Sequence, residues 1–500
     1  MLLLLTCLVP AAGGVILPFL PFRDDSGRKA ARIILMAVTD ILGAACIAGG
    51  GAVTLFRLAD GVTIALKADG AGKFFLIAVL ILYTVVTVYA HEYFALENEK
   101  GRELDRFFAF MFVSLGALLS AGLSANLVTL YFFFELATLS TVPLVLHEMT
   151  KEAVSAGLKY LFYSIAGALL GLLAVFFVYS FGTGSAEFVY GGFLDPAKVA
   201  GREGMLLAAV FAGIVGFGTK AGLYPMHGWL PTAHPIAPAP ASALLSAIVT
   251  KAGVLAIIRL VYYSVGPEFL LGTWVQRAWM CLAMLTIFMG SMMAFREKVI
   301  KKRLAYSSIS QISYILLALS TLSSDGLEGG LLHLMSHMAA KGTLFLAAGV
   351  FIAKLGRRRQ DELKGIGKLM PVTLWCYMFA SLSLVGIPPM GGFLSKWVIA
   401  SSLINHGSGV FAVLPPVILI ISALLTAGYL FPVVIDGFFP GRDFVQDQVK
   451  ITSLSGESSI QPASEGAAEP TAAMTVPMLC LSAVALIMGI WGLKIVGLFV

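Results

Sequence analysis

Two histidines and a lysine recur at every fourth position of an otherwise apolar run, LLHLMSHMAAKGTLFLAAG. They are His333, His337 and Lys341. In a helix this spacing places the two imidazoles and the ammonium on one face. Histidine titrates near neutral pH and a buried lysine can be brought toward it, so such a ladder can pass protons between neighbouring groups. Packing with satisfied hydrogen bonds is the main alternative. A metal site is disfavoured, because no carboxylate or cysteine stands beside the histidines.

Four more charged residues interrupt apolar runs. A charge in the middle of a bilayer costs ~3 kcal/mol or more, so each marks a candidate functional position. Glu135 and Lys220 have opposite charge, and if they face each other the carboxylate controls when the lysine releases its proton. A static ion pair between two helices is the alternative. Lys251 and Lys396 lie in two further runs, and so many buried charges favour ion translocation over a structural role.

Helix-breaking residues accompany two of these lysines. Pro225 follows Lys220, and Pro388 and Pro389 precede Lys396. Proline removes a backbone donor, so both helices are expected to break there. Broken helices are tolerated in membranes where they line a cavity, and a matched pair is typical of transporters built from repeats. His227 and His234 follow the first break and can connect that cavity toward one surface, although a purely local role is an equal alternative.

The composition predicts an all-α polytopic membrane protein. Apolar residues make up 58% of the 500 residues and charged residues 12%, and the mean hydropathy is +0.90. Apolar stretches recur that are long enough to cross ~30 Å of hydrocarbon. Five scattered cysteines form no pairing motif, and no phosphate-binding loop, dinucleotide fingerprint or zinc-ligand cluster occurs, so no redox, nucleotide or metal cofactor is expected in this chain. The net charge of +6 reports topology and not nucleic-acid binding.

The apolar runs divide the chain into fourteen expected spans. Their approximate limits are 2–21, 31–56, 73–92, 106–122, 125–147, 153–181, 204–226, 240–264, 275–295, 302–320, 328–354, 370–388 continuing to 405, 411–436 and 473–499. We group them as an N-terminal part (1–105), a first repeat (106–264), a second repeat (275–436), a polar mobile loop without a site (437–472) and a final span (473–500).

Basic residues predict the orientation. Loops after the first, third, ninth and eleventh spans are rich in lysine and arginine, whereas loops after even-numbered spans are poorer. Basic loops stay on the cytoplasmic side, so both termini are expected on the opposite face of the cell's inner membrane. The apolar N-terminus lacks a basic leader and is interpreted as a first span, with a signal peptide as the alternative.

Four blocks of sequence resemble a known family. KAGLYPMHGWLPTAHPIAPAPASALLSAIVTKAGVLAIIR, KKRLAYSSISQISYILLAL, HLMSHMAAKGTLFLAAG and GIPPMGGFLSKW occur in this order. They are similar to the proton-conducting, antiporter-like membrane subunits of respiratory complex I, membrane-bound hydrogenases and Mrp-type cation/proton antiporters. The resemblance implies fourteen helices, two inverted five-helix repeats, and breaks in helices seven and twelve. It also implies partner subunits in a hetero-oligomeric complex, and transport of protons and, in some branches, Na⁺.

The resemblance assigns roles to the charged residues. Glu135 matches the family's glutamate of helix five, Lys220 and Lys251 match the lysines of helices seven and eight, and Lys341 lies on the motif of helix eleven. Lys396 matches a lysine of helix twelve that some branches replace with glutamate.

The residues indicate the branch of this family less clearly than the family itself. Thr232 stands where complex I subunits usually carry an acidic residue, and the chain ends soon after its last span, where one branch continues into a long lateral helix. A cation/proton antiporter subunit of the Mrp D type or a hydrogenase-type relative is therefore expected, with a proton-pumping subunit of NADH:quinone oxidoreductase as the alternative. In the redox complexes electron transfer would occur in other subunits, so whether the chain belongs to an enzyme stays open. A stand-alone carrier of an organic substrate is a third, weaker possibility.

Overall fold

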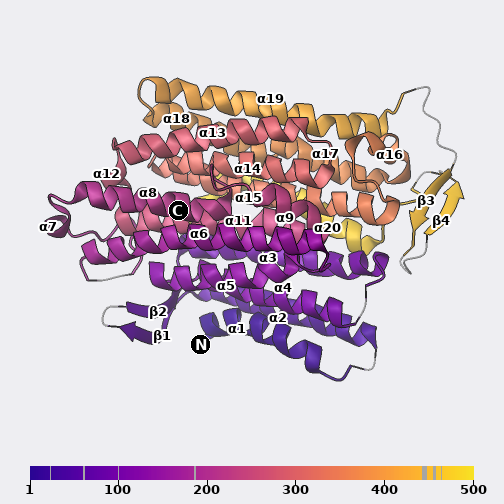
Figure 1. Ribbon diagram of the computed structural model, residues 1–500, viewed down its shortest axis with the longest axis horizontal. Helices are drawn as coiled ribbons and strands as arrows, with labels where there is room; N and C mark the ends of the chain where they lie inside the picture. The colour runs from indigo at the N-terminus through magenta and orange to yellow at the C-terminus, as the bar shows by residue number, and fades with distance from the viewer. Residues whose placement is uncertain are drawn as a thin grey trace.

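Long helices lie side by side in the computed structural model, with their axes nearly parallel, from α1 and α2 at one edge to α19 at the other (Figure 1). The structure describes residues 1–499 except 23, 60–61, 100, 185–186, 442–447, 454–457, 463 and 465. Arg23 and Lys100, which contributed to the orientation prediction, lie outside the described residues.

The described residues of the first half of the chain form ten α-helices, one 3-10 turn and one hairpin. Their bounds are α1 Leu2–Ile16, η1 Leu17–Phe19, α2 Asp25–Gly49, β1 Ala52–Ala59, β2 Val62–Lys67, α3 Gly70–Leu96, α4 Arg102–Gly122, α5 Leu127–Val145, α6 Lys151–Phe181, α7 Pro196–Val199, α8 Glu203–Ala221, α9 Leu230–Ile236 and α10 Ala239–Leu244.

The second half begins with a π-helical turn inside a long span. Its elements are η2 Leu245–Val249, α11 Thr250–Leu260, η3 Val261–Val265, α12 Pro267–Leu270, α13 Trp274–Arg296, α14 Ile300–Leu319, α15 Ser324–Leu355, η4 Gln360–Leu363, α16 Ile366–Leu369, α17 Pro371–Val385, α18 Gly391–His406, α19 Val410–Phe438, β3 Gln448–Thr452, β4 Ser458–Pro462 and α20 Ala472–Val496.

Twelve helices within the described residues are long and apolar enough to cross a membrane. Two of the fourteen expected spans fall outside that count. One is α14, which is rich in serine and begins with the basic run IKKR. The other is the broken pair α17 and α18, neither half of which reaches the length required. Both positions are nevertheless helical. α14 lies inside the bundle, where packing compensates for its lower apolar content.

Two highly enclosed spans lie at the centre of the molecule. In the span from Ala239 to Val265 every residue of the most apolar window is buried, and in α15 the buried share is 83%. α15 packs against α14, α17, α18, α20 and α3. These spans carry Lys251 and the His333, His337 and Lys341 ladder, so the protein places its buried basic groups in its interior layer and not against lipid.

The first helix break begins earlier than expected. α8 ends at Ala221, and Gly222 closes it with φ +84°, a left-handed conformation that favours glycine. The expected breaking residue, Pro225, lies in the connection to α9 three residues later. Gly386, with φ +93°, ends α17 in the same way, before Pro388 and Pro389. The prolines prevent each helix from resuming, but the glycines end it.

Two hairpins were not expected. β1 and β2 pair antiparallel between Ala52 and Lys67, so the second span ends near Gly49 and not at 56. β3 and β4 pair between Gln448 and Pro462, within the segment 437–472 that was predicted as a loop. In that segment Glu469 also reaches the first turn of α17, where its carboxylate accepts hydrogen bonds from the Val372 and Thr373 backbone N–H groups at 2.9 Å each.

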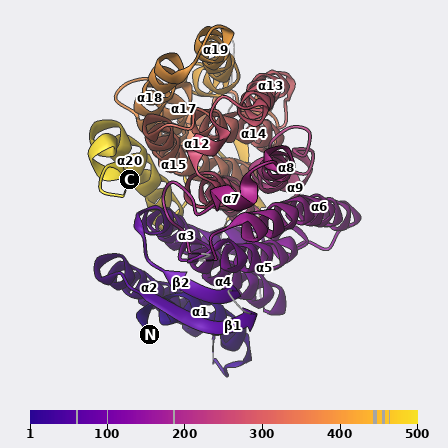
Figure 2. The same cartoon turned by 90° about the vertical axis from the view of Figure 1, so that its left-hand side faces the viewer.

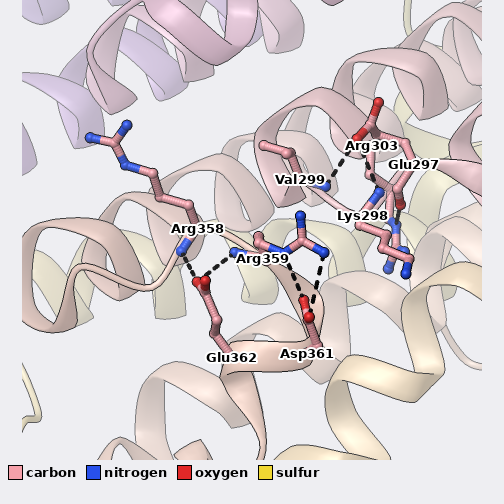
Figure 3. Close-up of polar contacts among 8 residues, drawn as sticks. All are labelled: Glu297, Lys298, Val299, Arg303, Arg358, Arg359, Asp361 and Glu362. Carbon is pink, nitrogen blue, oxygen red and sulfur yellow. Dashed lines mark hydrogen bonds and ion pairs between the residues drawn. The ribbon is translucent and has the colours of Figure 1, made fainter.

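Two of the basic loops join at one end of the bundle. The Ile300 N–H donates to the Arg358 carbonyl and the Gln360 N–H to the Lys298 carbonyl, at 3.0 Å each. Acidic residues order the loops, since Glu297 and Glu362 accept backbone hydrogen bonds and Asp361 lies 3.1 Å from Arg359 (Figure 3). Both chain termini lie toward the other end, on the side of β1, β2 and α7 (Figures 1 and 2).

Candidate functional site

The ladder on α15 is continuous, because the helix runs unbroken through all three residues. The His333 and His337 rings lie 6.1 Å apart. His333 Nδ1 is 2.9 Å from the Ser395 hydroxyl of α18, and the Lys341 ammonium donates to the Leu304 carbonyl of α14 at 3.0 Å. Among the described residues, His337 has no hydrogen-bond partner at either ring nitrogen. All three side chains are buried.

Lys396 is held by the free end of a broken helix. Its ammonium donates to the Leu384 carbonyl at 2.5 Å and to the Val385 carbonyl at 2.9 Å. These are the last carbonyls of α17, which lack helical partners and carry the negative end of the helix dipole. The ammonium also lies 5.1 Å from the centre of the Tyr314 ring. The break therefore supplies the acceptors that stabilise this lysine inside the bundle.

Lys220 lies near the end of α8 and rests on α5. Its ammonium donates to the Thr138 hydroxyl and, at 3.2 Å, to the Phe134 carbonyl. It lies 4.3 Å above the Phe134 ring, a favourable cation–π position.

Glu135, the expected partner of Lys220, forms no ion pair within 4 Å among the described residues. Its Oε1 atom is buried and has no hydrogen-bond partner in the described part of the chain. Lys220 instead binds the carbonyl of Phe134, the residue that precedes Glu135. The two residues are thus neighbours, but the structure does not show the direct contact that a static ion pair would require.

Lys251 follows the π-helical turn η2. Its ammonium donates to the Ser246 carbonyl at 2.6 Å, and the Ser246 hydroxyl lies 2.6 Å from that of Ser308 on α14. A π turn often marks a functional position in a helix. This turn was not predictable from the residues, because LLSAIVTKAG contains no proline and its one glycine follows the lysine.

The two accessory histidines differ in position. His234 is fully buried, and neither ring nitrogen has a partner among the described residues. Its ring packs against that of Phe345 on α15, with ring centres 5.5 Å apart. His234 therefore lies beside the helix that carries the ladder. His227 stacks against Tyr224 at 5.7 Å and lines a separate small pocket with Thr286 and Tyr306.

A cluster of buried hydroxyl groups adjoins the ladder and was not predicted. The Tyr314 hydroxyl donates to Ser422 at 2.7 Å, and Tyr314 packs against His333 with ring centres 5.3 Å apart. The Tyr429 hydroxyl donates to Ser307 at 2.7 Å. The signal was the serine-rich text SSISQISY on α14, but only the structure shows that α19 faces it with matching hydroxyls.

Lys220, Lys251, Lys341 and Lys396 come from α8, α11, α15 and α18. These helices contact one another in turn, with η2 joining α11 to α15. We call the four lysines, together with His234, His333 and His337, the basic row. Each ammonium is held by carbonyl or hydroxyl oxygens, which accept a hydrogen bond without neutralising the charge. Among the described residues no group of three or more histidine, cysteine, aspartate or glutamate side chains is arranged to hold a metal ion.

Comparison with known proteins supports the class that this geometry suggests. Residues 124–423 match the family described as NADH:quinone oxidoreductase/Mrp antiporter, transmembrane. The chain is 33% identical over 417 residues to NADH-quinone oxidoreductase subunit N of Desulforudis audaxviator (strain MP104C), covering 82% of this chain and 78% of the relative. It is 31% identical over 366 residues to hydrogenase-4 component B of Escherichia coli (strain K12), covering 70% of this chain and 52% of the relative.

A solved structure shares the fold over nearly the whole chain. A chain of the Mrp complex from Dietzia sp. DQ12-45-1b aligns with a TM-score of 0.80 and 20% identity, covering 99% of this chain and 95% of that one. Fold and site thus define a multi-pass, antiporter-like, proton-translocating membrane subunit. The chain belongs to the NADH:quinone oxidoreductase/Mrp antiporter family, as the sequence blocks predicted.

Proposed function

We propose that this chain carries protons along the buried basic row as one subunit of a larger membrane complex. Glu135 modulates Lys220, while Lys251, His333, His337 and Lys341 form the central relay. Lys396 exchanges protons with one bulk phase. His234 connects Lys251 with Lys341, and His227 connects the first helix break toward one surface.

The observation that carries this proposal is that no carboxylate of the described residues forms an ion pair with Lys251, Lys341 or Lys396. Lys251 and Lys341 are buried and Lys396 is half-buried. Among the described residues, each ammonium is bound by oxygen atoms of carbonyl or hydroxyl groups. A structural lysine at this depth is normally neutralised by an acidic partner, because an unpaired buried charge is costly. Several such lysines in one layer are expected in a protein whose lysines bind and release protons during transport.

The first test removes the two groups that begin the relay. Lys220→Ala and Glu135→Ala are each expected to abolish proton uptake by vesicles that contain the whole complex, while the complex still assembles. Lys298→Ala is the matched control, because it also removes a lysine charge but lies exposed in a loop outside the spans. A Lys220→Ala complex that transports normally would contradict the relay.

The branch of the family sets the driving force. The antiporter part of the family description supports a cation/proton antiporter, in which the proton gradient drives Na⁺ or a similar ion. The relatives named for NADH-quinone oxidoreductase and hydrogenase-4 support the alternative, in which electron transfer in partner subunits drives proton pumping. We place the joined basic loops on the cytoplasmic face and both termini on the other face of the inner membrane, on the strength of the basic-residue distribution.

An affinity tag on this chain distinguishes the branches. Mild detergent extraction followed by identification of the co-purifying chains is the experiment. Iron–sulfur or flavin subunits would make the chain part of a redox pump, and redox-driven proton uptake would follow as the assay. Small hydrophobic partners alone would make it an antiporter subunit, assayed by Na⁺-dependent collapse of a pH gradient.

A further inference from the structure

One carboxylate lies at mid-membrane depth outside the relay. Asp40 is on α2, 15 residues after Asp25 and nine before Gly49, the two ends of the helix. At about 1.5 Å per residue it lies about 22 Å and 14 Å from these ends, well inside the hydrocarbon layer. An acidic group at this depth needs a partner, and it marks a functional position by default.

The described residues give Asp40 one donor only. The Thr84 hydroxyl of α3 lies 2.8 Å from Asp40 Oδ2 and 3.0 Å from Oδ1. The same hydroxyl also lies 2.8 Å from the Leu80 carbonyl. A threonine has a single hydroxyl hydrogen, so it can satisfy the carboxylate or the carbonyl but not both. No lysine, arginine or histidine of the described residues forms an ion pair with Asp40.

Asp40 lines a hollow on the outside of the bundle. The hollow has a volume of about 400 Å³, and its described lining residues come from α2 and α3. Figure 2 shows α2 at the outer edge of the molecule, with α3 next to it on the side of the centre. Apart from Asp40 and Thr84 its lining is apolar: Ala44, Ile47, Ile77, Leu80, Ile81 and Val85.

The lining follows helical spacing on both sides. Asp40, Ala44 and Ile47 are four and three residues apart, which is one face of α2. The exposed Ala44 has a small side chain, and small residues let a neighbouring transmembrane helix approach closely. A shallow groove between two antiparallel helices therefore presents one negative charge at its middle.

We propose that this hollow docks a transmembrane helix of a neighbouring subunit that carries a lysine or arginine at mid-bilayer. Charge complementarity selects this occupant. A lipid acyl chain offers no donor to the carboxylate. A second copy of this chain packed symmetrically here would bring Asp40 toward another Asp40, which is unfavourable. The docking site lies on α2 and α3, apart from the relay residues, so it does not depend on the proposed transport route.

Photocrosslinking in the assembled complex tests the proposal. Benzoylphenylalanine replaces Ala44 in the hollow or, as the control, Ile420, which is exposed on α19. After irradiation of native membranes and purification of the complex, mass spectrometry identifies the crosslinked peptide. The Ala44 probe is expected to capture a transmembrane peptide with a lysine or arginine within about one helical turn of the crosslink, and the Ile420 probe is not.

Charge variants then test the ion pair itself. Asp40→Asn preserves the size of the side chain and removes the charge, so the crosslink yield is expected to fall roughly 3- to 30-fold, the range typical of intramembrane polar contacts. Exchanging the charges, with Asp40→Lys here and aspartate at the captured basic position, is expected to restore most of the yield.

Four results would overturn the proposal. They are a captured helix without a basic residue in that turn, a peptide of a second copy of this chain, adducts of lipid alone, and a yield that Asp40→Asn leaves unchanged. If the Asp40 variants fail to accumulate, the probe at Ala44 in the otherwise unaltered chain still identifies the occupant and decides the matter.

Discussion

His337→Leu should separate the relay from the packing of the protein. The imidazole is buried, and both of its nitrogens lack a partner in the described part of the chain. Leucine has a similar volume and no polar atoms. Leaving one buried polar group unsatisfied costs about 1–3 kcal/mol, so the substitution should leave the free energy of unfolding unchanged or raise it by about 1 kcal/mol. A residue kept for packing would show the opposite sign.

The same substitution should stop proton transfer. It leaves His333 and Lys341 as the remaining groups of the ladder, eight residues or about 12 Å apart along the helix. Proton transfer requires hydrogen-bond contact of about 2.6–3.2 Å, directly or through one water. A positioned acid–base group contributes about 100- to 10,000-fold to a proton-transfer rate. We therefore expect proton uptake to fall at least 100-fold.

The assay uses vesicles that contain the complete complex and an internal pH-sensitive dye, with thermal melting of the purified complex measured in parallel. Met335→Leu is the matched control, because it changes a buried apolar residue of the same helix and leaves the ladder intact. Proton uptake within twofold of the unaltered complex, or a clear fall in melting temperature, would refute the assignment of His337 to the relay.

Three further predictions concern the elements that hold the site. Asp69→Asn breaks the pair with buried Arg259, whose guanidinium lies 2.5 Å and 2.6 Å from the carboxylate, and should cost about 3 kcal/mol at neutral pH. Burial raises the Asp69 pKa, but the Arg259 charge and hydrogen bonds outweigh it and hold the pKa below its usual value. The stabilisation is thus complete above about pH 4 and is lost as the pH falls through the lowered pKa, so melting temperatures of the two proteins should converge in acid. Gly253→Ala places a Cβ 2.5 Å from the Phe217 carbonyl oxygen and 3.2 Å from Lys220 Cβ. The substitution should force α8 and α11 apart and reduce proton uptake. Gly204→Ala is the control, because a Cβ there meets nothing within 4 Å, and it should leave proton uptake unchanged. Glu469→Ala removes three hydrogen bonds from the first turn of α17 and should lower stability by about 1–3 kcal/mol; an unchanged melting curve would contradict a capping role.

The class of fold was predicted correctly from the apolar runs. The lysines proposed for the relay were found in the same way, because a charge inside an apolar run is visible without coordinates. Lys220, Lys251, Lys341 and Lys396 were identified in this way. The partners of these lysines were not predictable, since they are backbone carbonyls and hydroxyls that carry no distinctive residue type. The Glu135 and Lys220 charges suggested direct contact, but the structure places Thr138 and Phe134 at the ammonium.

Three features had weaker signals. The π turn before Lys251 depends on packing in the centre of the bundle and left no mark in the sequence. The helix ends at Gly222 and Gly386 were attributed to the nearby prolines, because proline is the stronger breaker by composition alone. Asp40 met the same criterion as the relay residues and was passed over, although MAVTDILGAACIAGG places it within an apolar run.

The carbonyl oxygens that hold Lys251, Lys341 and Lys396 have an electrical consequence. Because they are neutral, each proton that enters this part of the row adds a full charge to the interior. Glu135, which we propose modulates Lys220, is the one acidic residue assigned to the relay. A charge that crosses the whole membrane gains or loses about 2.3 kcal/mol per 100 mV, and a charge at each lysine experiences a fraction of that. Membrane voltage alone, at equal pH on both sides, should therefore redistribute protons along the row, and the subunit should respond to voltage as directly as to pH.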